Sequence, residues 1–257
     1  MRRTCALSVV VAAALLLASC DRPRTTSGES ESEADAASGP LKASTPWRNG
    51  VDYITLLPPV VPAHVPQGKI EVVEAFSYEC GVCFRFEPSM SRWLASKPEY
   101  VEFKRMHVVW RPMHLAHARL FYALKALGRD DLHGEIFNAI HVHENLLFVD
   151  EDNDRTFNLQ LKFAIDHGVD AAEFTKTYNS EAVNADVEHA REFTRRYLVD
   201  SSPTIIVNGK YTSGIARVGI DHENPRASVN YDRLITLTSD LAAEEYKKTK
   251  EENAGEP

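Results

Sequence analysis

Cysteine is scarce in this chain, and the few positions that it occupies restrict which disulfide bonds can form. Only four of the 257 residues are cysteines. Cys5 lies in an N-terminal segment that we expect to be removed, and Cys20 stands at the end of that segment. A framework of several disulfides is therefore excluded, and Cys80 and Cys83 have only each other as partners.

The chain also lacks the marks of a protein that binds nucleic acid or a nucleotide. It has 29 lysines and arginines against 37 aspartates and glutamates, a formal net charge of −8 at pH 7, and no run of basic residues. It contains no glycine-rich phosphate loop and no internal repeat. Nucleic acid is therefore not expected as a partner.

The first 19 residues have the pattern of a secretory signal peptide. Two arginines precede the apolar run Ala6–Ala18, which is short for a membrane span and is followed by polar sequence. The run leads into Leu-Ala-Ser-Cys20, which resembles the bacterial lipobox and predicts a lipid anchor on Cys20. Asp21, the next residue, would favour retention at the inner membrane. Cleavage elsewhere, for example after Ala18, would instead leave a soluble periplasmic protein.

Composition divides the rest of the chain into a tether, a folded part and a tail. Residues 20–46 are rich in Ser, Ala, Glu and Asp and contain no aromatic residue, so we expect a disordered tether. Residues 47–246 are numerous enough for one domain with an insertion. Residues 247–257 form a charged tail.

Hydrophobic periodicity divides the chain between 70 and 247 into extended and helical segments. The expected extended segments cover 70–76, 101–109 and 203–212, the last of which holds the hairpin signal Asn208-Gly209. The expected helices are 81–96, with a kink at Pro88, and then 115–127, 131–143, 156–167, 171–179, 184–197 and 231–247.

Cys80-Gly-Val-Cys83 lies at the start of the helix expected over 81–96. A structural zinc ion would need a second pair of ligands at similar spacing. The only short-spaced candidate, His141-Val-His143, has flanks typical of an amphipathic helix, so we expect no metal. A static disulfide is the other alternative, although so short a loop constrains little of the unfolded chain. The motif therefore favours a dithiol that cycles with a disulfide.

The order of strand, CxxC helix, strand, helical block, hairpin and helix resembles the DsbA family of periplasmic thiol:disulfide oxidoreductases. The resemblance is sharpest over residues 74–83, with an acidic residue, aromatics and the cysteine pair, and over residues 201–211, with Ser202-Pro203 and Val-Asn-Gly-Lys-Tyr. It implies an α/β, thioredoxin-like fold with an inserted α-helical domain. The first part of that fold would cover 47–111, the helical insertion 112–197, and the second part 198–246.

The position of each cysteine suggests its role. Unpaired amides at a helix N-terminus stabilise negative charge, so Cys80 is expected to be the exposed nucleophile. Cys83, one turn into the helix, would resolve the mixed disulfide. The resemblance implies a cis Ser202-Pro203 bond beside the dithiol, with the Ser202 backbone offered to an extended substrate and its hydroxyl able to reach the Cys80 sulfur. Alternatively, Pro203 simply begins a strand.

Glu74 is a carboxylate within an apolar strand, where burial is costly without a compensating partner. The family places an acidic residue at this position beneath the active site, paired with a basic residue on the next strand, and Arg105 is the matching candidate. Such a carboxylate can exchange protons with the resolving thiol or tune the thiolate. The alternative is that Glu74 faces solvent at the end of the strand.

These features lead to one functional hypothesis and two alternatives. The hypothesis is a membrane-tethered, monomeric enzyme that donates disulfides to reduced or unfolded exported proteins and is recharged by a quinone-linked membrane partner of the DsbB type. It needs no cofactor other than its own Cys80–Cys83 disulfide. The alternatives are a reductase or isomerase, although no dimerisation domain is visible, and a peptide-binding module with a structural disulfide.

The two residues between the cysteines depart from the family pattern, which is Pro-His, with a histidine that helps to stabilise the thiolate. Here they are Gly81 and Val82, and Glu79 adds a negative charge beside Cys80. We therefore predict a protein that is less oxidising than the Pro-His enzymes. Equilibration with glutathione buffers measures the redox potential, and a value at or above theirs would contradict the prediction.

Overall fold

The computed structural model describes residues 47–60, 65–224 and 226–254. The expected signal peptide, the tether through residue 46 and the predicted lipid attachment at Cys20 lie outside these residues. Within the described ranges, no helix is both long enough and apolar enough to cross a membrane.

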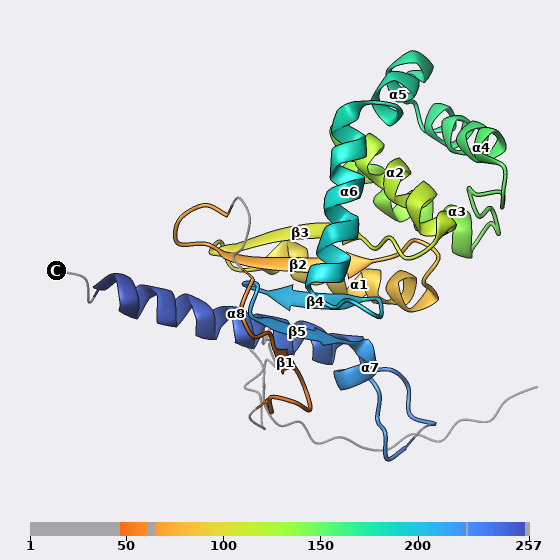
Figure 1. The fold of residues 1–257 in the computed structure, drawn as a ribbon. Coiled ribbons are helices and arrows are strands. Elements are labelled where there is room, and N and C mark those ends of the chain that lie inside the picture. The colour runs from red at the N-terminus through yellow and green to blue at the C-terminus, as the bar shows by residue number, and fades with distance from the viewer. Residues whose placement is uncertain (1–46, 61–64, 225, 255–257) are drawn as a thin grey trace, which may run out of the picture. The chain divides into compact units, whose positions relative to one another are not determined.

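A five-stranded mixed sheet forms the centre of the fold (Figure 1). Strands β2 and β3 are parallel, and the other neighbouring pairs are antiparallel. Parallel neighbours need a crossover connection, which the helix after β2 supplies. In their order across the sheet, the strands are β1 (Ile54–Thr55), β5 (Tyr211–Gly214), β4 (Thr204–Val207), β2 (Ile70–Phe76) and β3 (Val101–His107).

Two long helices, α1 (Gly81–Ser96) and the C-terminal α8 (Tyr231–Ala254), pack in one core with residues of the sheet. A helical block lies between β3 and β4 in the chain and occupies the upper right of Figure 1. The predicted thioredoxin-like fold with a helical insertion is therefore confirmed. The block consists of α2 (Pro112–Ala126), the 3₁₀ helix η1 (Asp130–Leu132), α3 (His133–His141), α4 (Asn153–Asp166), α5 (Ala171–Tyr178) and α6 (Glu181–Arg196), and a short α7 (Ile215–Val218) follows β5.

Strand β2 is buried along its whole length because helices cover both faces of the sheet. Side chains alternate between the two faces along a strand. Val72 belongs to the core that contains residues of α1 and α8, whereas Val73 and Ala75 pack with Phe193 of α6. Glu74 is two residues from Val72 and therefore lies on the face that α1 covers.

The hairpin signal Asn208-Gly209 is confirmed by the backbone geometry. Both residues have positive φ, 50° and 63°, as the centre of a type I′ turn requires. The Lys210 N–H donates to the Val207 carbonyl oxygen at 2.9 Å and closes the turn. The returning chain forms β5, so β4 has a neighbour on each side and is held firmly against β2.

The C-terminal helix is longer than the sequence predicts. The predicted helix ends near residue 247 and a charged tail follows it, but α8 continues to Ala254. The buried Glu245 accepts hydrogen bonds from Lys210 at 2.6 Å and Tyr211 at 2.9 Å, and Lys248, just past the predicted end, donates to the Tyr211 hydroxyl at 3.3 Å. These contacts attach the helix to the hairpin and support its last turns. Strand β1 and helix α7 are not predicted from the sequence, because they are too short to show a periodic pattern.

Candidate active site

The CxxC motif begins α1, directly after the turn that follows β2. Cys80 is the N-cap residue, with φ −74° and ψ 107°, and Cys83 lies in the first turn. The Cys83 N–H donates a hydrogen bond to the Cys80 sulfur at 3.2 Å. Both side chains are free thiols, and Cys80 is half-buried whereas Cys83 is 0% exposed. The start of the helix thus presents one thiol at the surface and encloses the other.

The surroundings of Cys80 favour its thiolate. A hydrogen bond from the Cys83 side chain is the largest influence and lowers the pKa of Cys80. The Ser202 side chain and the backbone N–H groups of Cys83 and Val82 lower this pKa further, against the opposing effect of partial burial. The resulting pKa is about 5, so Cys80 is ionised at neutral pH.

Burial is the largest influence on the pKa of Cys83. It raises the pKa of this thiol well above its ordinary value, and both the hydrogen bond to Cys80 and the charge of Cys80 act in the same direction. Cys83 therefore keeps its proton while Cys80 is a thiolate. A nucleophile and a resolving thiol require this division.

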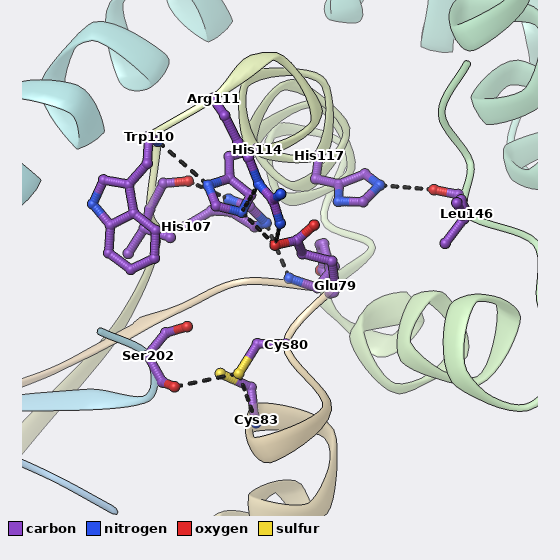
Figure 2. A network of polar contacts seen from close by, with 12 residues as sticks. Glu79, Cys80, Cys83, His107, Trp110, Arg111, His114, His117, Leu146 and Ser202 are labelled. Atoms are coloured by element: carbon purple, nitrogen blue, oxygen red, sulfur yellow. Dashed lines mark hydrogen bonds and ion pairs between the residues drawn. The ribbon is translucent and has the colours of Figure 1, made fainter. Parts of the chain in front are cut away.

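The loop before β4 meets the dithiol at the surface. Its Ser202-Pro203 peptide bond is cis, as the resemblance implies. The Cys80 sulfur lies 3.3 Å from the Ser202 carbonyl oxygen, which accepts a hydrogen bond from the thiol when Cys80 is protonated (Figure 2). Strand β4 begins directly after this bond and pairs with the C-terminal half of β2. The register of the two strands therefore brings the loop to the end of β2 from which the CxxC motif follows.

Glu74 is buried beneath α1 and is paired as predicted. The strand register places Arg105 directly opposite it on β3, and Arg105 Nε donates to Glu74 Oε2 at 3.1 Å. Glu74 is 0% exposed, which excludes the alternative of a solvent-facing side chain. Its other oxygen, Oε1, has no hydrogen-bond partner among the described residues. Burial raises the pKa of Glu74 to about 7, although the Arg105 charge opposes the rise.

Three side chains that extend this pair were missed by the sequence-based prediction. Arg105 Nη2 also binds Glu87 at 3.1 Å. His133 Nε2 lies 3.1 Å from the same carboxylate, and the Tyr78 hydroxyl lies 3.0 Å from His133 Nδ1. Burial raises the pKa of Glu87, but hydrogen bonds from His133 and Arg105 outweigh it, so this pKa is lowered overall. Glu87 follows Cys83 by four residues, a spacing that indicates a shared helix face.

Three further histidines, His107, His114 and His117, lie above Cys80 in the view of Figure 2. Burial lowers the pKa of each, to about 4 for His114 and His117. All three are therefore neutral at neutral pH. The sequence-based prediction did not single them out, although most of the ten histidines fall between residues 107 and 143.

Glu79 does not stand beside Cys80 as an unpaired charge. Its carboxylate is bound by Arg111, and Oε1 lies 2.8 Å from His114 Nε2. The expectation that Glu79 repels the thiolate omits these two partners. Both belong to the start of α2, and no local sequence pattern brings that segment to the CxxC motif.

His141 of the His-Val-His segment, the candidate zinc ligands in the sequence, makes a hydrogen bond and a ring contact within the fold. His141 ends α3, its Nε2 donates to the Tyr78 carbonyl oxygen at 2.8 Å, and its ring stacks on Phe84 with 4.9 Å between centroids. In the part of the chain that the structure describes, no group of three His, Cys, Asp or Glu side chains has the arrangement of a metal site.

Known proteins are similar to this chain in sequence and in fold. No protein-family model matches the chain. The chain is 37% identical over 169 residues to the thiol:disulfide interchange protein DsbA of Burkholderia cepacia, which covers 65% of this chain and 76% of that protein. It is 36% identical over 171 residues to the DsbA of Pseudomonas aeruginosa, which covers 66% of this chain and 77% of that protein.

Solved structures agree with the sequence comparison. The crystal structure of Pseudomonas aeruginosa DsbA matches with a TM-score of 0.69 and 31% identity, over 79% of this chain and 97% of that chain. The oxidoreductase DsbA of Xylella fastidiosa matches with a TM-score of 0.63 and 27% identity, over 76% of this chain and 98% of that chain.

Replacing Glu74 with Gln tests the electrostatic link between this carboxylate and the buried thiol. The Glu74 charge contributes to the raised pKa of Cys83, so we expect Glu74→Gln to lower that pKa by about one unit. Titration of the Cys83 ¹³Cβ chemical shift in the reduced protein measures the change. Glu99→Gln removes an exposed carboxylate and is the control. An unchanged midpoint in Glu74→Gln would show that the link does not exist.

Replacing His117 with Gln tests whether a buried neutral histidine limits stability in acid. Burial lowers the pKa of His117 from 6.5 to about 4, so the unfolded chain takes up a proton at this residue before the folded protein does. Stability is therefore lost as the pH falls from 6.5 to 4, by up to ~3 kcal/mol for this residue. Urea unfolding at a series of pH values should show a shallower loss in His117→Gln than in the wild type. Parallel curves for the two proteins would refute the prediction.

Proposed function

Because the chain belongs to the DsbA family of thiol:disulfide interchange proteins, we propose that it catalyses disulfide bond formation in exported proteins through Cys80 and Cys83. One observation carries this proposal: a half-buried thiol with a pKa of about 5 begins α1 and lies 3.3 Å from the carbonyl oxygen that precedes a cis proline. A thiolate of this kind forms mixed disulfides and also leaves them readily.

The reaction runs through a mixed disulfide. In the oxidised protein, a substrate thiolate attacks the Cys80 sulfur, the Cys80–Cys83 bond breaks, and Cys83 takes the electron pair and a proton. A second substrate thiolate then attacks the substrate sulfur of the mixed disulfide, and Cys80 leaves as a thiolate. In total, two substrate thiols are oxidised to one disulfide, and the protein disulfide is reduced to the dithiol.

Glu74 and Ser202 support these two steps. Cys83 must gain a proton when the protein disulfide opens, and the buried Glu74 carboxyl, with a pKa of about 7, can hold that proton at neutral pH. Arg105 fixes the orientation of this carboxyl through the Nε contact to Oε2. The Ser202 carbonyl oxygen faces Cys80 and provides a hydrogen-bond acceptor for the backbone of an extended substrate.

The proposal extends to the compartment and the redox partner. We place the protein in the bacterial periplasm, held at the inner membrane by a lipid on Cys20 and the tether of residues 20–46. Disulfides form and persist in such an oxidising compartment. A monomer whose redox group is the Cys80–Cys83 disulfide needs an oxidant after each turnover, and a quinone-linked membrane protein of the DsbB type has the required chemistry. Cleavage after Ala18 would leave the same activity in a soluble protein.

The alternatives differ from a disulfide donor in the state of the dithiol. A reductase or isomerase would keep Cys80 and Cys83 reduced in the cell, whereas a donor would keep them oxidised, so trapping the thiols directly from cells distinguishes the two. A binding module with a structural disulfide has no use for a thiolate, yet the pKa of Cys80 is lowered by several contacts. The relatives named as interchange proteins favour the donor.

Replacing Cys80 with Ala separates an enzyme from a binding module. The variant lacks the sulfur that forms the mixed disulfide, so its oxidation of a reduced, unfolded protein should fall to the uncatalysed rate. The assay is the rate at which substrate thiols disappear, with insulin reduction measured in parallel. Faster insulin reduction than substrate oxidation by the wild-type protein would favour a reductase. Full activity of Cys80→Ala would overturn the proposed function.

A further inference from the structure

Glu79 places a carboxylate directly before the cysteine that must ionise. A negative charge close to a thiol disfavours the thiolate, because the two like charges repel. The structure turns the Glu79 side chain away from the Cys80 sulfur and toward the start of α2 (Figure 2). There the carboxylate meets two donors from a segment that lies some thirty residues further along the chain.

The two donors differ in charge and exposure. Arg111 is the N-cap residue of α2, its guanidinium binds Glu79 Oε1, and its side chain is 55% exposed. His114 is 3% exposed and lies 2.8 Å from the same oxygen. His114 Nδ1 accepts from the backbone N–H of Trp110 at 3.4 Å, and Nε2 lies 3.3 Å from Arg111 Nε and 2.8 Å from Glu79 Oε1; a proton on Nε2 is donated to the carboxylate.

The start of α2 adds to this positive environment. The first N–H groups of a helix carry partial positive charge, and α2 has no side-chain cap of its own. A carboxylate close to this helix start is therefore favoured. The partners of the Glu79 carboxylate thus come from the start of α2, Arg111 and His114, and not from the CxxC helix α1.

We propose that Arg111 and His114 are positioning residues for the reaction of Cys80: both bind the Glu79 carboxylate, Arg111 cancels its charge beside the nucleophile, and the neutral His114 holds it by a hydrogen bond. The inference rests on the proposed redox function of Cys80. It gives the start of α2 a part in the chemistry of the dithiol, because Arg111 is the N-cap residue of this helix and His114 lies in its first turn.

The proposal predicts opposite effects for the two members of the ion pair. Arg111→Gln leaves Glu79 uncompensated, so the ionisation constant of Cys80 should fall by about threefold. Glu79→Gln leaves the Arg111 charge unpaired near Cys80, so the constant should rise by about threefold. The double variant should return close to the wild-type value, because both charges are then absent.

The ultraviolet absorbance of the thiolate, followed against pH in the reduced full-length protein, measures the ionisation constant directly. Equilibrium with glutathione is the second readout: the protein disulfide and two glutathione thiols give the dithiol and one glutathione disulfide. The equilibrium constant for reduction should fall in Arg111→Gln and rise in Glu79→Gln by the same factors. If Arg111 and Glu79 acted only in folding, the two variants would not shift the ionisation constant, or the equilibrium constant, in opposite directions.

Two further variants sharpen the test. His114→Leu removes the second donor and should act in the direction of Arg111→Gln, whereas His114→Gln keeps an N–H donor and should act less. Arg92→Gln is the matched control, because this variant, like Arg111→Gln, loses an arginine that forms an exposed ion pair, here with Asp232 at 2.9 Å. Arg92 lies near the far end of α1, about 18 Å along the helix from Cys80, so its loss should change nothing.

The outcomes separate this inference from the proposed function. A wild-type Cys80 that titrates like an ordinary thiol would overturn both. A low wild-type pKa that is unchanged in Arg111→Gln and in Glu79→Gln would overturn only the positioning role. Should Arg111→Gln fail to fold, Glu79→Gln still decides, because its predicted shift has the opposite sign and a shift toward a weaker acid would refute the proposal.

Discussion

The hydrogen bonds that the first turn of α1 makes to the Cys80 sulfur are the interaction on which the active site depends. The Cys83 thiol, Ser202 and the backbone N–H groups of Cys83 and Val82 together lower the pKa of Cys80 to about 5, with no cationic side chain between the cysteines. The backbone donors are fixed by helix geometry and are present whatever residues occupy positions 81 and 82. Loss of the histidine that the family has in this motif therefore removes one contribution and leaves the others in place.

Strand β2 positions the CxxC motif, the proline loop and the buried Glu74 relative to one another. Its C-terminal end leads into the CxxC motif, its antiparallel neighbour β4 begins directly after the cis Ser202-Pro203 bond, and its parallel neighbour β3 supplies Arg105. The nucleophile, the proline loop and the buried carboxylate are thus set by the pairing of one central strand. The helices that cover both faces of β2 exclude water from Glu74, and this exclusion raises its pKa.

The features that the sequence predicts well are those determined by local pattern or by strand register. Cys80 falls at a helix start, Asn208-Gly209 forms the expected turn, and Glu74 meets Arg105 once the two strands are recognised as parallel neighbours. The contacts of His114 with Glu79 and of His133 with Glu87 have a different origin. They depend on how α2 and α3 pack against the sheet and α1, and helical periodicity specifies which face is buried but not which partner it meets. The length of α8 was missed for the same reason.

The carboxylates around the dithiol show how the protein keeps negative charge near a thiolate without opposing it. Glu79 has Arg111 and His114, and Glu87 has Arg105 and His133, so each of these carboxylates is bound by one guanidinium and one histidine. Glu74 receives only the Nε–H of Arg105 among the described residues, and Nη2 of the same guanidinium binds Glu87. One guanidinium cannot neutralise two buried carboxylates, so the less well bonded carboxylate holds the proton more tightly. This carboxylate is Glu74, whose charge also raises the pKa of Cys83, the thiol that needs a proton when the disulfide opens.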